Sequence, residues 1–105
     1  MIEKGGEIKM AKSQHDLIAE KLADKFGTQY KSDKGVDIVT SNRVIEVETK
    51  KNSLEQGIGQ IERSSKARYL AVPKSILKSA LEQTEGKGIG VMNNTGRIIK
   101  RAGRK

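Results

Sequence analysis

The segment from Gly35 to Lys50 constrains the fold of this chain more than any other stretch of its sequence. Two runs rich in Val and Ile, GVDIVT and RVIEVETK, flank Ser41 and Asn42, which are typical turn residues. The pattern predicts a β-hairpin with strands near residues 36–40 and 43–50. If Ser41 and Asn42 alone form the loop, Asp37 lies directly opposite Glu46.

The predicted hairpin concentrates negative charge. Side chains alternate between the two faces of a strand, so Glu46, Glu48 and Lys50 share one face. With Asp37 across from Glu46, three carboxylates meet on one patch that has a lysine at its end. Like charges facing each other across a sheet are destabilising. The patch therefore indicates a bound cation, or else an exposed face with salt bridges, which would contribute little to stability.

The segments around the hairpin alternate between helical and extended patterns. Apolar spacing and turn residues predict helices at 13–26, from 52 or 53 onward and at 75–85, and strands at 28–31, 69–72, 89–92 and 97–100. The order of elements is α, β, β, β, α, β, α, β, β. It predicts an α/β fold in which the antiparallel hairpin leads into a parallel pair, so that helices flank a mixed central sheet.

A single domain, residues 1–105, accommodates these elements. Residues 1–12 read as a polar lead-in, and residues 101–105 are expected to form a mobile basic tail. Only 34% of the residues are hydrophobic, and the chain has one Phe, two Tyr and no Trp. Because such a core is thin, we expect the chain to form a homodimer.

Two of the predicted helices carry specific local signals. Ser13 is the expected N-cap of the first helix, and its apolar stripe consists of Leu17, Ile18, Leu22 and Phe26. The run Ser53-Leu54-Glu55-Gln56 matches a capping box at the start of the second. Gly57 and Gly59 each cost a helix interior about 1 kcal/mol relative to Ala. They indicate either the close approach of another group or a weak helix.

Composition limits the classes of function. The chain has no cysteine, which excludes disulfides, thiolate zinc sites and a cysteine nucleophile. No run approaches the roughly 18 apolar residues of a membrane span, and the first residues lack an apolar signal core, so a cytoplasmic location is the default expectation.

The formal net charge is +8, and residues 96–105 contain five basic residues and no acid. A basic excess favours nucleic acid as a partner, with a solubilising surface as the alternative. The candidate phosphate contacts are Arg63, Arg97, Lys100 and Arg101.

The chemistry of the hairpin patch depends on its context. Glu-x-Lys triplets occur three times in the chain, at Glu7, Glu48 and Glu85, so the triplet by itself carries little information. The middle one lies on a predicted strand beside Asp37. Converging carboxylates suit a hard divalent cation, which prefers oxygen ligands. An ammonium group beside such a metal can orient a water and stabilise charge on a phosphoryl oxygen.

The segment GVDIV, a turn and VIEVETK resembles the PD-(D/E)xK nuclease superfamily, which has the restriction-endonuclease-like fold. Residues 13–72 look most like the small archaeal Holliday junction resolvases, which share the first helix, "VDIV", "IEV" and a crossover helix leading into "LAV". The resemblance implies that Asp37 and a glutamate bind Mg²⁺, for which Mn²⁺ can substitute. It also implies that a lysine helps to activate the attacking water, and that the polar face of the second helix, with Gln60, contacts the site or the DNA.

The resemblance leaves the remaining site residues open. Hairpin pairing favours Glu46 as the second metal ligand and puts Glu48 at the usual lysine position, whereas the Glu-x-Lys spelling favours Glu48 with Lys50. Both glutamates and Lys50 are therefore candidate catalytic residues. Resolvases have a glutamate early in the first helix, where this chain has Gln14. Asp16 or Glu20 is the nearby acid that could complete the site, and His15 is expected to be a solvated first-turn residue.

The resemblance predicts a metal-dependent endodeoxyribonuclease, with cleavage of branched DNA in recombination or repair as the specific expectation. A homodimer would place two such sites on a symmetric junction. One alternative is a non-catalytic nucleic-acid-binding module of the same fold, which Gln14 favours. Another is a restriction or repair nuclease that acts on a different DNA substrate.

Overall fold

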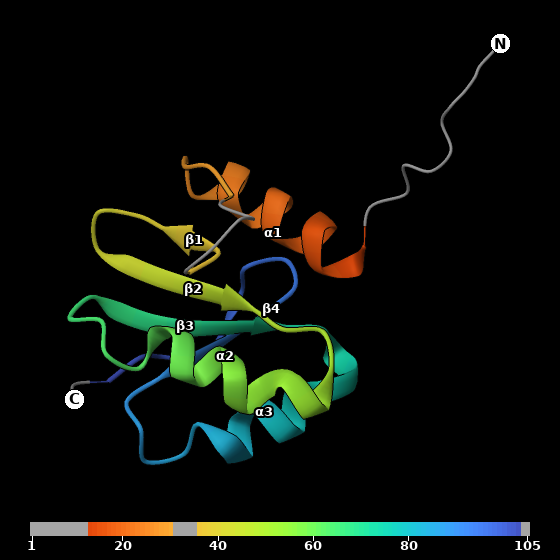
Figure 1. The fold of residues 1–105 in the computed structure, drawn as a ribbon, viewed down its shortest axis with the longest axis vertical. Coiled ribbons are helices and arrows are strands. Elements are labelled where there is room, and N and C mark those ends of the chain that lie inside the picture. Colours follow the sequence, from red (N-terminus) through yellow and green to blue (C-terminus); the bar gives the residue numbers. More distant parts are fainter. Residues whose placement is uncertain (1–12, 31–35, 104–105) are drawn as a thin grey trace, which may run out of the picture.

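A computed structural model of the chain describes residues 13–30 and 36–103 (Figure 1). This part of the chain forms an α/β fold with three α-helices and one mixed sheet of five strands in the order β1-β2-β3-β4-β5. The elements are α1 (Gln14–Lys25), β1 (Ile38–Val39), β2 (Arg43–Val47), α2 (Leu54–Ile61), β3 (Ala67–Val72), α3 (Leu77–Gln83), β4 (Gly90–Asn93) and β5 (Ile98–Lys100). Short 3-10 turns, Lys51–Ser53 and Lys74–Ile76, precede α2 and α3.

The hairpin has the predicted register. Ile38 pairs with Ile45 and Val39 with Val44 in antiparallel orientation, and the Thr40 backbone N–H donates to the Arg43 carbonyl at 2.9 Å. Ser41 and Asn42 are therefore the two loop residues. Both strands are shorter than expected, because β1 has two residues and the chain turns away after Val47 toward the 3-10 turn.

The sheet continues from the hairpin in the predicted mixed sense. β2 pairs with β3 and β3 with β4 in parallel, across connections that contain α2 and α3. β5 returns antiparallel to β4 with a register shift near Met92. Between them, the Asn93 side chain accepts hydrogen bonds from the backbone of Thr95 and Arg97. Gly96 has φ of +88°, a conformation that glycine adopts without steric cost.

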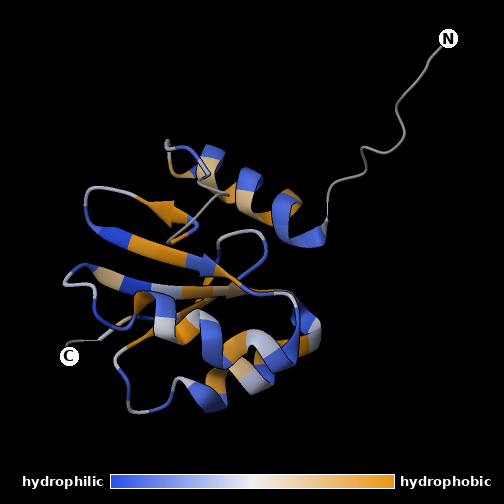
Figure 2. Cartoon of the chain, viewed as in Figure 1, coloured by the Kyte–Doolittle hydropathy of each residue, from blue (hydrophilic) through white to orange (hydrophobic). Residues whose placement is uncertain are grey.

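Helices cover both faces of the sheet (Figure 1). Figure 2 shows hydrophobic and hydrophilic residues interspersed around the helices, as expected for helices that bury one face. One core forms beneath α1 from Ile18, Ala19, Leu22, Ala23, Ile38, Ile45, Val47, Tyr69, Ala71 and Met92. The other lies beneath α2 and α3 and consists of Val44, Leu54, Ile58, Ile61, Leu70, Val72, Ile76, Ala80, Ile89 and Val91.

Two sequence expectations about local structure are wrong. Residues 28–30 of the predicted strand 28–31 are not extended into the sheet, because Thr28 instead caps the end of α1 through the Ala23 carbonyl and bonds the Val39 carbonyl. Lys31 lies outside the described residues. Leu17 is 55% exposed, since the buried face of α1 centres on Ile18, Ala19, Leu22 and Ala23.

The predicted basic tail, residues 101–105, directly follows β5. Its first part is bound to the fold, because Ala102 N–H donates to the Tyr69 hydroxyl and Gly103 N–H to the Gly88 carbonyl. Residues 104–105 and the predicted lead-in, residues 1–12, lie outside the described part. None of the described helices has the length and apolarity that a membrane crossing requires.

Candidate functional site

The hairpin holds two of the predicted carboxylates against each other. Asp37 precedes β1 and lies opposite Glu46 of β2, and the two residues are only 6% and 7% exposed. The backbone N–H of Asp37 donates to Glu46 Oε1 at 3.2 Å. The backbone N–H of Val47 donates to Asp37 Oδ2 at 2.9 Å. Both carboxylates are therefore oriented by main-chain donors of the hairpin itself.

Glu48 follows directly after β2 and packs against α2. Its Oε1 accepts a hydrogen bond from Ser53 Oγ at 2.6 Å. A Cβ atom on Gly57 would stand 2.6 Å from Glu48 Cγ, closer than real contacts allow, whereas one on Gly59 would meet nothing within 4 Å. Gly57 thus provides the space that the Glu48 side chain fills.

The use of Ser53 corrects the predicted capping box. Ser53 is the N-cap of α2, but its side chain caps no backbone N–H of the helix. The hydroxyl instead donates to Glu48 and lies within hydrogen-bonding distance of the Lys50 carbonyl. The capping-box pattern in the sequence does not indicate that a carboxylate competes for the Ser53 hydroxyl.

Burial and mutual repulsion make the three carboxylates difficult to ionise together. Burial, followed by the charge of Asp37, raises the pKa of Glu46 to about 8. Burial also raises the pKa of Asp37, although the Val47 N–H and His15 act in the opposite direction. Burial raises the pKa of Glu48, with the Ser53 hydroxyl opposing it. In residues 13–30 and 36–103, the one ion pair to any of the three joins His15 to Asp37.

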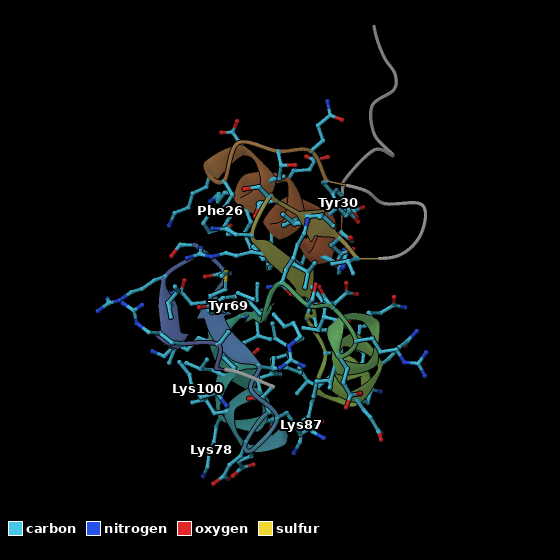
Figure 3. The ribbon with its side chains drawn as sticks, turned by 90° about the vertical axis from the view of Figure 1, so that its left-hand side faces the viewer. Phe26, Tyr30, Tyr69, Lys78, Lys87 and Lys100 are labelled. Carbon is cyan, nitrogen blue, oxygen red and sulfur yellow. The ribbon has the colours of Figure 1, made fainter. Side chains whose placement is uncertain are left out.

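Sequence reasoning missed the role of His15. Its Nε2 lies 3.0 Å from Asp37 Oδ2 and its Nδ1 lies 3.2 Å from the Tyr30 hydroxyl. Tyr30, beside α1 in Figure 3, donates in turn to Asp16 Oδ1 at 2.7 Å. His15 is thus a half-buried member of the site rather than the solvated residue that we expected. The one sequence feature that could have indicated this role is the Ser13 N-cap. Its hydroxyl accepts a hydrogen bond from the Asp16 N–H and fixes where the first turn of α1, with His15, begins.

The other candidate residues lie at different distances from this cluster. Asp16 reaches it only through Tyr30 and His15. Gln14 and Glu20 are exposed on α1, and Lys50 is exposed at the start of the 3-10 turn. No hydrogen bond or ion pair joins the Lys50 ammonium to Asp37, Glu46 or Glu48. Because the hairpin register pairs Asp37 with Glu46, the residue at the usual lysine position, two residues after Glu46, is Glu48 and not Lys50.

The donor set of the site is suited to a hard cation. Asp37, Glu46 and Glu48 offer only oxygen atoms, which Mg²⁺ and Mn²⁺ prefer. A bound dication would also relieve the repulsion that raises their pKa values. As they stand, no three His, Asp or Glu side chains of the described residues form a group that could hold a metal ion. Ser53 retains Glu48 and His15 contacts Asp37, so metal binding requires these side chains to rearrange.

The candidate nucleic-acid contacts lie on or just beyond α2 and around β5. Gln60 is exposed on α2, and Arg63 is exposed just beyond it. Arg97 and Arg101 are exposed on either side of β5, while the Lys100 ammonium bonds Thr84 Oγ1 at 2.7 Å. β5 is three strand spacings from β2, or about 14 Å. That separation corresponds to roughly four nucleotide steps along one strand.

Two further basic residues, Arg68 and Lys66, have structural partners. The Arg68 guanidinium, which is buried, donates to the carbonyls of Glu62 and Lys87 and so anchors the segments that flank β3 and β4. The Lys66 ammonium donates to the Thr40 carbonyl of the hairpin. Both side chains serve the fold, which leaves Arg63, Arg97 and Arg101 as the exposed members of the candidate surface.

No protein-family model, curated protein or solved structure matches this chain. The function of this chain is therefore inferred from its own residues and geometry and from the resemblance of its hairpin motif.

Proposed function

We propose that the chain is a divalent-metal-dependent endodeoxyribonuclease with a restriction-endonuclease-like core, which hydrolyses phosphodiester bonds of DNA. The observation that carries the proposal is the pair of buried carboxylates, Asp37 and Glu46, fixed face to face by the backbone of one hairpin. Burial of two adjacent acids without a lysine or arginine partner among the described residues destabilises the fold. Such an arrangement is typical of a functional site.

Each residue of the site has a distinct role in this proposal. Asp37 and Glu46 hold the metal, which polarises the phosphoryl oxygen and activates a water when it is bound. Glu48 stands where the superfamily usually has lysine, so the motif is the Glu-x-Glu variant. After leaving Ser53, its carboxylate is the third oxygen ligand. Lys50 lies two residues after Glu48 and is the candidate to contact the cleaved phosphate.

The charge distribution supports DNA as the substrate. The net charge of +8 attracts a polyanion, and contacts from Arg97 and Arg101 to phosphates would supply affinity without reading sequence. Branched DNA is the proposed preference, with a homodimer presenting two sites to two strands. A restriction or repair nuclease that acts on linear duplex is the variant of this proposal that differs in substrate.

A non-catalytic DNA-binding module is the second candidate. The observation that favours it is the contact of His15 with Asp37 Oδ2, since a histidine that donates a proton there would stabilise the Asp37 carboxylate without a metal. The exposed Gln14 at the position of the resolvase glutamate points the same way. A module of this kind binds DNA in EDTA as well as in Mg²⁺ and cleaves none.

Cleavage assays distinguish the two candidates. Four-way junction, flap, single-stranded and linear duplex DNA are incubated with the protein in Mg²⁺, Mn²⁺ or EDTA. The nuclease proposal expects metal-dependent products, with the branched substrates cut fastest. Tight, salt-sensitive binding without cleavage of any substrate would instead identify the binding module. Glu46→Gln and Glu48→Gln, assayed beside the exposed control Glu82→Gln, report which glutamates the reaction needs.

A further inference from the structure

A cavity lies where the loop after α2 enters β3, beside the last described residues of the chain. It has a volume of about 500 Å³ and is lined by residues 64–68 together with Ala102 and Gly103. Figure 1 shows the end of the chain close to the start of β3. The volume lies in the range of ligand-binding pockets, about 300–1,000 Å³. None of the residues that line the cavity is acidic.

Arg68 brings a buried positive charge to the wall of this cavity. The residue is only 3% exposed, and its guanidinium donates to the carbonyls of Glu62 and Lys87 at 2.9 and 3.0 Å. Those two bonds orient the guanidinium but engage only two of its five N–H groups. Within the described part of the chain, no carboxylate forms an ion pair with Arg68. Because a buried charge without a counter-ion is costly, Arg68 indicates an anion in the cavity.

The neighbouring residues add further hydrogen-bond donors. The Lys66 ammonium donates to the Thr40 carbonyl at 2.7 Å, which leaves its other N–H groups for a ligand. Ser64 Oγ accepts from the Lys66 backbone N–H, so the hydroxyl proton of Ser64 is available. Ser65 is exposed, and its hydroxyl bonds no other described group. The polar side chains of the cavity therefore present positive charge and donors.

We propose that this cavity binds a phosphate group. Arg68 and Lys66 neutralise its charge, and the hydroxyls of Ser64 and Ser65 donate to its oxygen atoms, because charge-assisted donors suit anionic oxygens. The phosphate belongs either to the backbone of a nucleic acid or to a terminal phosphate monoester, which offer the same kind of oxygen. The inference goes beyond the proposed nuclease function, since the cavity contains none of the residues assigned to cleavage.

The cavity is separate from the carboxylate pair. Ala67, at the cavity, pairs with Arg43, the first residue of β2, and Glu46 lies three residues further along that strand. At a rise of about 3.3 Å per residue, the two places are about 10 Å apart along the sheet. A phosphate group in the cavity has no carboxylate beside it and needs no bridging cation. Its binding should therefore persist in EDTA.

Ser65→Asp tests the cavity without removing a side chain that anchors the fold. The new carboxylate repels an anion at close range and should weaken phosphate binding at least about 10-fold. Ser75→Asp is the matched control, because it makes the same change in net charge at an exposed position in the 3-10 turn before α3. It lies outside the cavity and should change binding less than about 2-fold at physiological salt.

A nuclear magnetic resonance titration in EDTA, at constant ionic strength, measures the binding. The ligands are inorganic phosphate, an oligonucleotide with a 5′-phosphate and the same oligonucleotide with a 5′-hydroxyl. We expect chemical-shift changes at the amides of residues 64–68 and Gly103 that Ser65→Asp abolishes or weakens. A preference for the 5′-phosphorylated strand assigns a terminal phosphate to the cavity. Equal binding of the two oligonucleotides assigns a backbone phosphate, and tighter binding of inorganic phosphate assigns a small phosphorylated ligand.

Two results would overturn the phosphate site. One is that no ligand shifts these amides, and the other is that Ser65→Asp and Ser75→Asp bind equally well. Thermal unfolding checks the same point independently, because a ligand that binds only the folded chain raises Tm. Phosphate should raise Tm of the wild type and of Ser75→Asp above that in chloride of equal ionic strength, but not that of Ser65→Asp. Neither result depends on DNA cleavage, so failure of the phosphate site and failure of the nuclease proposal are distinguishable.

Discussion

Replacement of Glu46 by Gln should stabilise the metal-free protein at alkaline pH. In the folded chain, burial and the neighbouring Asp37 raise the pKa of Glu46 from 4.5 to about 8. The folded protein therefore retains a proton that the unfolded chain loses between these two values. The stabilisation is fully present below pH 4.5 and is lost as the pH rises through about 8. Gln has the same shape and no charge, so it removes this loss.

The size of the effect follows from the displacement of the pKa. A tenfold change in a protonation equilibrium corresponds to about 1.4 kcal/mol, which sets an upper limit of about 5 kcal/mol. Since solvent reaches part of the patch and screens its charges, about 2–3 kcal/mol is the expected difference. For a chain of this size that amounts to a shift of roughly 10 °C or more in Tm.

Urea unfolding in EDTA at several pH values between 5 and 8.5 measures the difference. The free energy of unfolding of the wild type should fall across this range, whereas that of Glu46→Gln should fall less, because only Asp37 and Glu48 still have raised pKa values there. At pH 5 the two proteins should be similar, and at pH 8.5 the variant should be more stable. Glu82→Gln, which removes an exposed acid from α3, should follow the wild type. An equal loss of stability in Glu46→Gln and the wild type would refute the electrostatic reasoning.

The remaining predictions concern α2 and the basic surface. Gly57→Ala should destabilise the fold by about 1–3 kcal/mol in thermal unfolding, because its Cβ would displace Glu48. Gly59→Ala, where space is open, should stabilise it by about 0.5–1 kcal/mol, and a similar loss in both variants would contradict this account. Arg97→Ala and Arg101→Ala should each lower the slope of log Kd for DNA against log salt by about 1. An unchanged slope would show that these arginines do not contact DNA phosphates. Ser53→Ala frees the Glu48 carboxylate and should tighten Mn²⁺ binding in a calorimetric titration, and weaker binding would show that Ser53 instead orients Glu48 for the metal.

The register of the hairpin could be predicted because it depends on neighbouring residues alone. The alternation of apolar side chains and the two-residue turn at Ser41 and Asn42 both require Asp37 to face Glu46, and a slip by one residue would bury the wrong face. The mixed sheet was predictable for a similar reason, since the spacing between the later strands leaves room for helices. These features needed no knowledge of how α1 docks.

The contacts that could not be predicted join segments far apart in the sequence. His15 meets Asp37 across 22 positions, and only the docking of α1 on the sheet brings them together. Ser53 matches the sequence pattern of a capping residue, but its hydroxyl donates to the Glu48 carboxylate instead. A hydrogen bond to a carboxylate is stronger than one between neutral groups. Leu17 fits the apolar stripe by spacing, yet the helix buries the side centred on Leu22.

The proposed function requires that Asp37 enables metal-dependent cleavage of DNA. Single-turnover cleavage of a labelled four-way junction in Mn²⁺, by wild type and Asp37→Asn, tests it most directly. We predict that the wild type cuts the junction, that EDTA stops the reaction, and that Asp37→Asn is at least about 100-fold slower with an unchanged Kd for the DNA. Cleavage by Asp37→Asn at the wild-type rate, or none by the wild type despite tight binding, would contradict the claim.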